Sequence, residues 1–263
     1  MHIKRYIYSI LAWTLTPMAA VGAEVGDSAA RGLSFYIPEV HGVARARYEV
    51  DTDNGEGRFQ IRNARVNLSG RVLPRLRYYL NTDFCDKGSV KVLDVWARID
   101  IGSRWFVQAG QFRIPFGTDN FRGPGTYYFA NRSYLGKYVN NVRAVGIKGR
   151  YTLPWGSANY IEAGMFNSAT ISDHDVWSKD YAYAVKVSQQ AADWLRFETG
   201  FESIEPGSVR MNLWGASAIV TVGTLRAEAE YMLFHLKTIV ARYPDTPTAH
   251  AVKSTCDRWH QWL

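Results

Sequence analysis

Polar and apolar residues alternate along most of this chain in segments of strand length, and this pattern limits the fold more than any other feature. The run from Leu225 to Leu233 is the clearest case, because Arg226, Glu228 and Glu230 are separated by apolar or small residues. Successive side chains of a strand point to opposite faces, so each such run has one charged face and one apolar face. Helical periodicity is nearly absent, and an all-β chain is therefore predicted.

Clusters of turn-forming residues separate these runs. Gly, Pro, Asn and Asp gather at residues 51–55, 86–88, 154–156 and 205–207. Such clusters are typical of tight connections between antiparallel neighbours, whereas parallel strands need long crossovers. We predict about eleven antiparallel strands.

Alternation does not show which face of the sheet meets water. A soluble sandwich buries its apolar face, while a membrane barrel turns that face to lipid and its polar face to an aqueous lumen. Several charges on one face of each run suit a lumen, and aromatic residues near the ends of the runs suit the membrane interfaces. These aromatic residues include Trp105, Phe106, Trp155, Tyr160 and Trp194. We predict an antiparallel transmembrane β-barrel, with a secreted sandwich as the alternative.

Residues 1–23 carry the features of an export signal in the expected order. Lys4 and Arg5 precede the apolar stretch from Ile7 to Thr16, and small residues end at Ala23. The first acidic residue is Glu24. We predict cleavage after Ala23 and export, and an uncleaved amphipathic anchor is the alternative.

Positive charge is concentrated in the first half of the predicted mature chain. Residues 24–150 hold 20 Lys and Arg against 12 Asp and Glu, whereas residues 151–263 hold 9 against 12. A basic region indicates nucleic acid, a membrane surface or small anions as partners. Export makes nucleic acid the least suitable of these partners, so we expect the protein to bind no nucleic acid.

The pattern changes after Lys237. Residues 24–237 carry the alternation predicted for the barrel, but residues 238–263 contain Pro244 and Pro247 and resemble no strand hairpin. We expect a truncation or a frameshift near Lys237, and a genuine periplasmic or surface tail is the alternative.

Three segments between residues 58 and 117 carry a specific resemblance. They are RFQIRNARVNLSG at 58–70, LRYYLNTDF at 76–84 and AGQFRIPFG at 109–117. Together with NRS at 131–133 and VRAVGIKGR at 142–150, they resemble the phosphate-selective porin O and P family. The resemblance covers about residues 35–236. It implies an all-β, antiparallel transmembrane barrel of the outer-membrane porin type, with about sixteen strands in the family and a homotrimeric assembly.

The resemblance also implies a passive pore whose basic lumen residues attract small anions such as phosphate. The strand faces and the family motif together indicate Arg65, Arg77, Arg98, Arg113, Arg122, Arg132, Arg143, Lys148 and Arg150 as candidates. Acidic residues fall on the same faces, so cross-strand ion pairs are the alternative role for any one of these bases. Arg113, next to Pro115, has the further alternative of anchoring a turn.

Residues 118–140 exceed an ordinary hairpin connection in length. If this segment folds inward, Arg122, Arg132 and Lys137 would lie near a constriction, braced by Tyr127 and Tyr128. If it folds outward, it is a surface loop. The sequence leaves both alternatives open.

No enzyme signature stands out, and we expect a non-enzyme without cofactor or metal. The six His residues are scattered, and the group at Asp173, His174 and Asp175 reads as a solvated loop. The function we predict is an outer-membrane diffusion porin for small anions, with membrane lipid as its surroundings. Two alternatives are a non-functional truncated barrel and a smaller barrel with lipid hydrolase activity, for which Ser217 and His235 are the only nominees.

Overall fold

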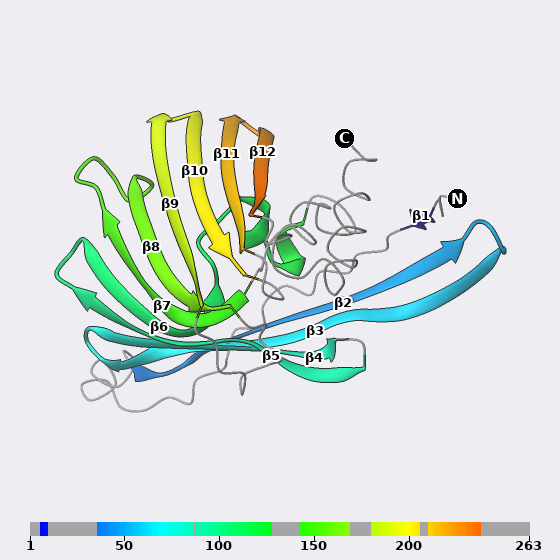
Figure 1. Cartoon of the computed structure of the whole chain (residues 1–263). Helices are drawn as coiled ribbons and strands as arrows, with labels where there is room; N and C mark the ends of the chain where they lie inside the picture. Colours follow the sequence, from blue (N-terminus) through cyan, green and yellow to red (C-terminus); the bar gives the residue numbers. More distant parts are fainter. Residues whose placement is uncertain are drawn as a thin grey trace, which may run out of the picture.

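The structure of the protein is a computed structural model that describes residues 6–9, 36–86, 88–127, 143–168, 180–205 and 210–237. Its described part is a single antiparallel sheet (Figure 1). The strands are β1 (Tyr6–Ser9), β2 (Glu39–Asp51), β3 (Glu56–Leu73), β4 (Leu76–Asp86), β5 (Ser89–Ile101), β6 (Trp105–Arg113), β7 (Arg143–Thr152), β8 (Tyr160–Asn167), β9 (Tyr181–Ala192), β10 (Leu195–Ile204), β11 (Arg210–Val222) and β12 (Leu225–Lys237).

Each strand pairs only with its neighbours in the sequence, in the order β1 to β12. This meander follows from the short polar connections, because tight turns join antiparallel neighbours directly. The all-β antiparallel prediction is confirmed, and β2 to β12 are the eleven strands that it expected. The sheet is open in the described part, since β12 and β2 are not paired with each other.

The short strand β1 pairs with the end of β2, where Tyr6 lies opposite Asp51 and Ser9 opposite Tyr48. It lies within the predicted export signal, so cleavage after Ala23 would remove it. The remainder of residues 1–35 and the tail at 238–263 lie outside the described residues. Signal cleavage and the atypical tail therefore stay predictions.

The connections differ in length between the two ends of the sheet. At one end, residues 102–104, 153–159, 193–194 and 223–224 form short turns. At the other end, the β6–β7 and β8–β9 connections span residues 114–142 and 168–180, whereas the β2–β3 turn at residues 52–55 is short. We call these the short-turn end and the long-loop end.

The hairpin of β2 and β3 extends beyond the neighbouring strand. β4 pairs only with residues 65–73 of β3, and the remainder of the hairpin projects from the sheet (Figure 1). On one face of this projection, the rings of Tyr48 and Phe59 lie 4.8 Å apart between centroids. On the other face, Glu49 pairs with Arg47 at 2.6 Å and with Arg58 at 2.7 Å.

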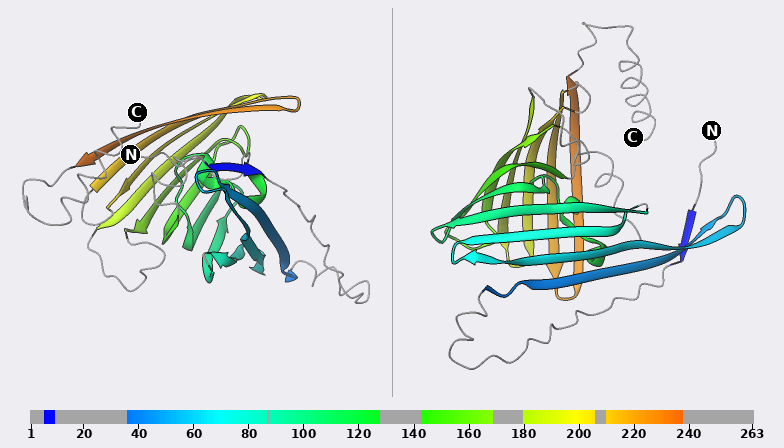
Figure 2. Two further views of the ribbon diagram at one scale, coloured as in Figure 1. Left: turned by 90° about the vertical axis from the view of Figure 1, so that its right-hand side faces the viewer. Right: turned by 90° about the horizontal axis from the view of Figure 1, so that it is seen from below.

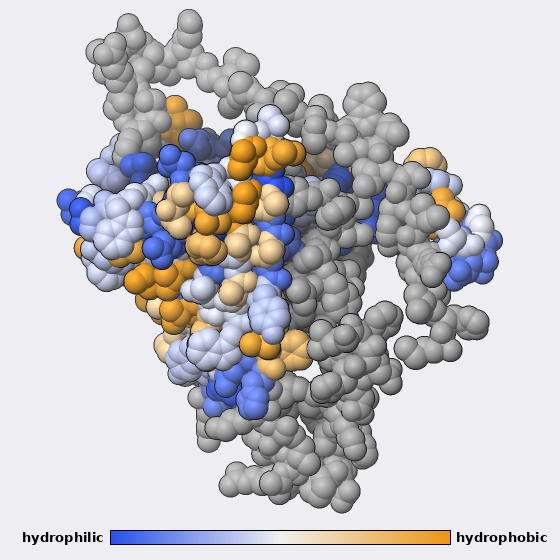
Figure 3. All heavy atoms as spheres, turned by 90° about the horizontal axis from the view of Figure 1, so that it is seen from above, coloured by the Kyte–Doolittle hydropathy of each residue, from blue (hydrophilic) through white to orange (hydrophobic). Residues whose placement is uncertain are grey.

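The sheet is strongly curved, so it has a convex and a concave face (Figure 2). Many exposed side chains are large and apolar, including Val95, Ile99, Ile147, Ile161, Val185, Phe197, Trp214 and Leu233. Buried positions of the same strands hold Asp94, Lys148, Glu162, Lys186 and Glu198. Apolar residues (orange) accordingly appear at the surface in Figure 3. Exposed apolar side chains and buried charged ones are the reverse of the arrangement in a soluble protein. They are typical of a barrel with lipid outside and water inside.

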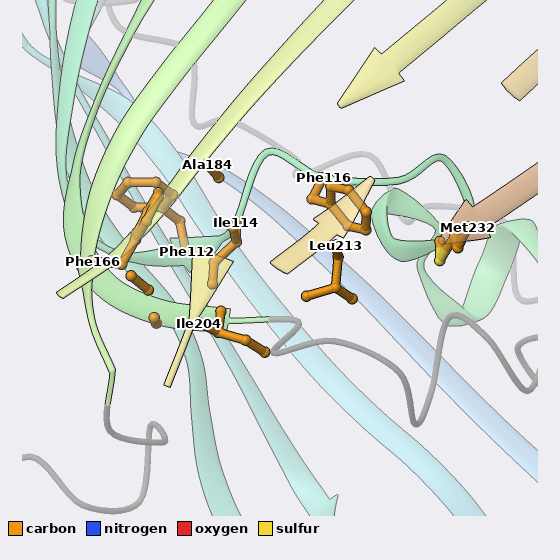
Figure 4. Close-up of a cluster of buried hydrophobic side chains, with 10 residues drawn as sticks. Phe112, Ile114, Phe116, Phe166, Ala184, Ile204, Leu213 and Met232 are labelled. Atoms are coloured by element: carbon orange, nitrogen blue, oxygen red, sulfur yellow. The ribbon is translucent and has the colours of Figure 1, made fainter. Parts of the chain in front are cut away.

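A small apolar core lies between the concave face and the residues that follow β6 (Figure 4). Ile114 and Phe116 come from this part of the chain, and Phe112, Phe166, Leu213 and Met232 come from the sheet. The rings of Phe112 and Phe166 meet edge to face, with centroids 5.5 Å apart. The core therefore fastens one loop to the sheet and does not fill the whole concavity.

The aromatic residues at strand ends divide into two groups. Trp105, Trp155 and Trp194 are exposed near the short-turn end, as predicted for an interface. Phe106 and Tyr160 instead lie under cationic side chains on the concave face. Their assignment to an interface was wrong, because each occupies the opposite parity of its strand. Among the described residues, no helix has the length and apolar character needed to cross a membrane.

Candidate functional site

The segment Ile114–Tyr127 leaves β6 and folds onto the concave face of the sheet. Pro115 cannot extend the strand's hydrogen-bond ladder, and short 3-10 turns follow at Asp119–Phe121 and Pro124–Thr126. Arg113 donates from Nη1 to the carbonyl oxygens of Asn120 and, at 2.9 Å, Arg122. Arg113 thus anchors the turn, which is the alternative that the sequence left open for it. We call residues 114–127 the inward segment.

Phe116 docks on two glycines of the sheet. It is fully buried, and Gly200 and Gly215 are direct cross-strand partners beneath it. A Cβ atom at Gly200 or Gly215 would lie 3.2 or 3.1 Å from the Phe116 ring. Only a residue without a side chain lets the ring approach the backbone this closely.

Polar contacts to β9, β10 and β11 fix the next two residues. Lys186 Nζ donates to the carbonyl oxygen of Gly117 at 2.7 Å and pairs with Glu198 at 2.8 Å. The Thr118 hydroxyl lies 2.8 Å from Glu198 Oε2 and 2.6 Å from the Ser217 hydroxyl. These buried polar groups satisfy one another, as a water-poor environment requires.

Contacts to the two edge strands hold the remainder of the segment. Glu230 of β12 accepts hydrogen bonds from the backbone N–H of Thr118 at 2.6 Å and of Asp119 at 3.3 Å. Arg122 forms an ion pair with Glu228 of the same strand. Tyr127, at the far end, lies under Arg45 of β2, with 5.2 Å from the guanidinium carbon to the ring centroid. The described residues 118–127 therefore fold inward, while residues 128–140, including Arg132, lie outside the described part.

The candidate bases of β3 and β7 are paired with buried aspartates. Arg65 Nε lies 2.7 Å from Asp83, and Arg143 binds both oxygens of Asp94 at 2.8 and 3.0 Å. Asparagine amides complete these groups, since Asn63 donates to Asp83 and Asn81 to Asp94. Such groups stabilise the contacts between strands, which is the alternative role that the sequence left open.

Nearer the short-turn end, four bases share two carboxylates. Arg77 and Arg98 lie 2.8 and 3.1 Å from Asp100. Lys148 and Arg150 lie 3.1 and 2.7 Å from Glu162, which is fully buried. The described part of this group thus carries two more positive than negative charges. We call Arg77, Arg98, Lys148 and Arg150 the basic cluster.

An aromatic ring lies within the basic cluster. The charged groups of Arg98, Lys148 and Arg150 lie 4.5, 5.9 and 5.4 Å from the centroid of Phe106. Arg150 also lies over Tyr160, at 3.8 Å. The negative face of an aromatic ring attracts cations, so these rings hold the bases in place without neutralising them.

Comparison of the sequence with models of known protein families identifies the family of this chain. The family model for phosphate-selective porin O and P matches residues 39–199, which is more than half of the chain. The chain belongs to this porin family. A search of curated proteins found no match.

Within this porin, the matched residues contain β2 to β9, the whole inward segment and the basic cluster. They end within β10, at Thr199. The wall formed by β11 and β12, which binds the inward segment through Ser217, Glu228 and Glu230, lies outside the match.

Two basic residues of the concave face were not named as candidates from the sequence. Arg45 and Arg62 have no acidic partner within the described part of the porin, and the Arg45 Nε is buried without a hydrogen bond. Arg45 is subject to repulsion from Arg47, Arg62 and Arg65. The signal was present, because Arg45, Arg47 and Glu49 alternate with Ala44, Ala46 and Tyr48. The register shift between Arg45 and Ala46 brings Arg62 to this group, and no local pattern reveals that shift.

The nominees for a hydrolase do not come together. Ser217 is buried on the concave face against Thr118. His235 is exposed and pairs across strands with Asn212, five positions from Ser217 along β11. His235 is therefore not placed to act as a base for Ser217. Asp173, His174 and Asp175 lie outside the described residues, and the described ones contain no group of metal-ligating side chains.

Proposed function

We propose that this porin forms a passive diffusion pore for small anions in the outer membrane. The observation that carries the proposal is the surplus of positive charge on the concave face. Four bases share two carboxylates in the basic cluster, and Arg45 and Arg62 lack an acidic partner within the described residues. Bases along an aqueous path lower the electrostatic barrier for anions, provided that binding stays weak enough for release.

The convex face supports a location in lipid. Its apolar side chains are exposed over the length of the strands, and Trp105, Trp155 and Trp194 lie near the short-turn end. Bacterial barrels have short periplasmic turns and longer outer loops. The short-turn end, with the basic cluster, would then face the periplasm, and the inward segment would enter from outside. The mature barrel would comprise residues 24–237.

A pore in lipid needs a closed sheet. The edges of β2 and β12 carry backbone N–H and C=O groups, and each such group left unpaired in hydrocarbon costs several kcal/mol. Closure therefore requires that both edges pair, either with each other or with further strands. Family resemblance favours a homotrimer of closed barrels as the working assembly.

Planar-bilayer recording of the full chain tests this proposal. Under a KCl gradient, we expect discrete conductance steps and a reversal potential on the side of chloride permeation. Inorganic phosphate added to one compartment should reduce the chloride current, because both anions would use the same bases. A cation preference would overturn the anion pore. Absence of steps from a correctly inserted, heat-modifiable protein would favour the non-functional barrel.

A further inference from the structure

The inward segment is bound at two sites that lie on opposite edges of the open sheet. Thr118, Asp119 and Arg122 contact β12, while Tyr127 contacts Arg45 of β2. The segment thus crosses the concavity from one edge strand to the other. Any displacement of it from β12 would change the width of the aqueous path.

Glu230 is arranged for this segment. Its two carboxylate oxygens accept from two successive backbone N–H groups, at 2.6 and 3.3 Å. Hydrogen bonds to a charged group are about twice as strong as neutral ones. Gly117 makes the approach possible, because its φ is +72° and a Cβ there would lie 2.9 Å from Glu230 Oε1. Among the described residues, both hydrogen bonds of Glu230 go to the inward segment.

Glu228 adds a second contact one pleat away on the same face of β12. It pairs with Arg122 of the inward segment and, at 2.7 Å, with Arg226 of its own strand. Both glutamates lie beyond residue 199, where the family match ends. The family match therefore assigns them no role.

We infer that Glu230 and Glu228 are positioning residues of the pore, which hold the inward segment against β12 and thereby set the width of the lumen. The inference rests on the proposed function, because it assigns a task within that pore. It extends the pore machinery to β12, the edge strand of the described sheet.

A disulfide between the inward segment and β11 reports on the position of the segment. The hydroxyls of Thr118 and Ser217 lie 2.6 Å apart, so T118C with S217C places two thiols within bonding reach. The background carries C85S and C256S to remove the native thiols. The initial rate of disulfide formation in oxidised glutathione then measures how often the segment is in place.

The decisive comparison is E230Q against E205Q, each in this background. Glu205 is a matched control, since it pairs with Arg210 at 2.7 Å and does not contact the segment. In E230Q one of the two acceptors becomes a donor, so we expect disulfide formation to slow by about ten-fold, as loss of one hydrogen bond to a charged group implies. E205Q should match the parent. Equal rates for E230Q and E205Q would overturn the inference.

Single-channel recording supplies the functional measurement. In reduced E230Q we expect a larger mean conductance with flicker between levels, and oxidation should restore the steady parental level. A purely structural role for Glu230 would lower the yield of folded barrel without this redox-dependent change. Unchanged conductance in folded E230Q would count against the inference.

A second variant serves if E230Q does not assemble. G117A leaves the wall intact and pushes the segment from Glu230, so it should slow disulfide formation by a similar factor. A parental rate in G117A would overturn the inference. If no variant conducts but E230Q or G117A still slows the disulfide, the pore proposal fails while the positioning role stands.

Discussion

Two regions of the concave face use their charged residues differently. In β3 to β8, the buried carboxylates pair with bases of the sheet itself, as Asp83 does with Arg65, Asp94 with Arg143 and Glu162 with Lys148 and Arg150. In β10 to β12, Glu198, Glu228 and Glu230 bind the inward segment. The first region stabilises the sheet through its own register, whereas the second holds a loop that lies far away in the sequence.

The difference shows that a charged strand face does not by itself indicate a pore lining. The alternation looks the same in β7 and in β12. Yet Lys148 is almost enclosed by Glu162 and aromatic rings, while Glu230 is directed at backbone N–H groups of the inward segment. In both regions buried carboxylates such as Glu162 and Glu198 pair with bases, but only in the second do carboxylates also bind a loop.

Removal of a shared carboxylate should have the largest effect, and it tests the first region. Glu162→Ala leaves Lys148 and Arg150 without their acidic partner. We expect unfolding in urea to become easier by about 3–5 kcal/mol, because an uncompensated buried charge remains. The shift from the folded to the unfolded band on a gel follows the transition. Glu49→Gln, in the projecting hairpin, is the control, and an equal loss there would contradict the contrast between buried and projecting pairs.

A side chain added at Gly215, where the Phe116 ring packs on the sheet, tests the apolar contact of the second region. Gly215→Val adds side-chain atoms where even a Cβ would lie 3.1 Å from the ring. We expect a loss of about 1–3 kcal/mol from overpacking, together with a larger channel conductance as the segment lifts. Gly149→Val, in β7, adds the same side chain away from Phe116, where the nearest atom to a Cβ would be the Phe106 carbonyl oxygen at 3.8 Å. If Gly215→Val left the conductance at the parental value, the segment would not narrow the path.

Removal of the two bases without acidic partners separates selectivity from stability. For Arg45→Ala with Arg62→Ala, the stability should fall by no more than about 1 kcal/mol, since no ion pair is broken and only the cation–π contact of Arg45 with Tyr127 is lost. The anion-to-cation permeability ratio should fall by roughly two-fold, because positive charge is lost from the path. Reversal potentials measure this ratio. Arg58→Ala, on the projecting hairpin, should leave it unchanged, and an equal fall there would point to a general surface-charge effect.

The smallest effect is expected at an exposed pair of the second region. Arg226→Gln removes a partner of Glu228 on the same strand but leaves Arg122 in place. Exposed ion pairs contribute about 0–1 kcal/mol, so the unfolding midpoint should barely move. Conductance should also stay at the parental value. A clear gain in conductance would show that Glu228 holds Arg122 only when Arg226 positions the Glu228 carboxylate.

Much of the sheet could be predicted from the sequence. The alternation in Leu225 to Leu233 predicted β12 (Leu225–Lys237), and turn residues predicted the meander. The face of several bases also followed from parity, as Arg65 and Lys148 illustrate. Phe106 and Tyr160 were misassigned because proximity to a strand end was given more weight than parity.

The candidate site was predictable only in part. Arg113 and Arg122 were identified as bases, but their partners are a pair of backbone carbonyls and a glutamate of β12. Nothing in the sequence predicted that Gly200 and Gly215 bind Phe116, because a glycine in a strand does not reveal which aromatic ring will lie on it. Arg45 and Arg62 depended on a register shift between β2 and β3.

The sequence by itself determined the strands, their antiparallel order and the two chemical faces of the sheet, because a period of two and a tight turn are properties of neighbouring residues. Only the tertiary structure decided that the segment after β6 folds inward and that Glu230 receives it. The backbone of Thr118 and the side chain of Glu230 are 112 residues apart in the chain. Contacts of that separation arise from the curvature of the whole sheet and from packing against its concave face, which no local pattern encodes.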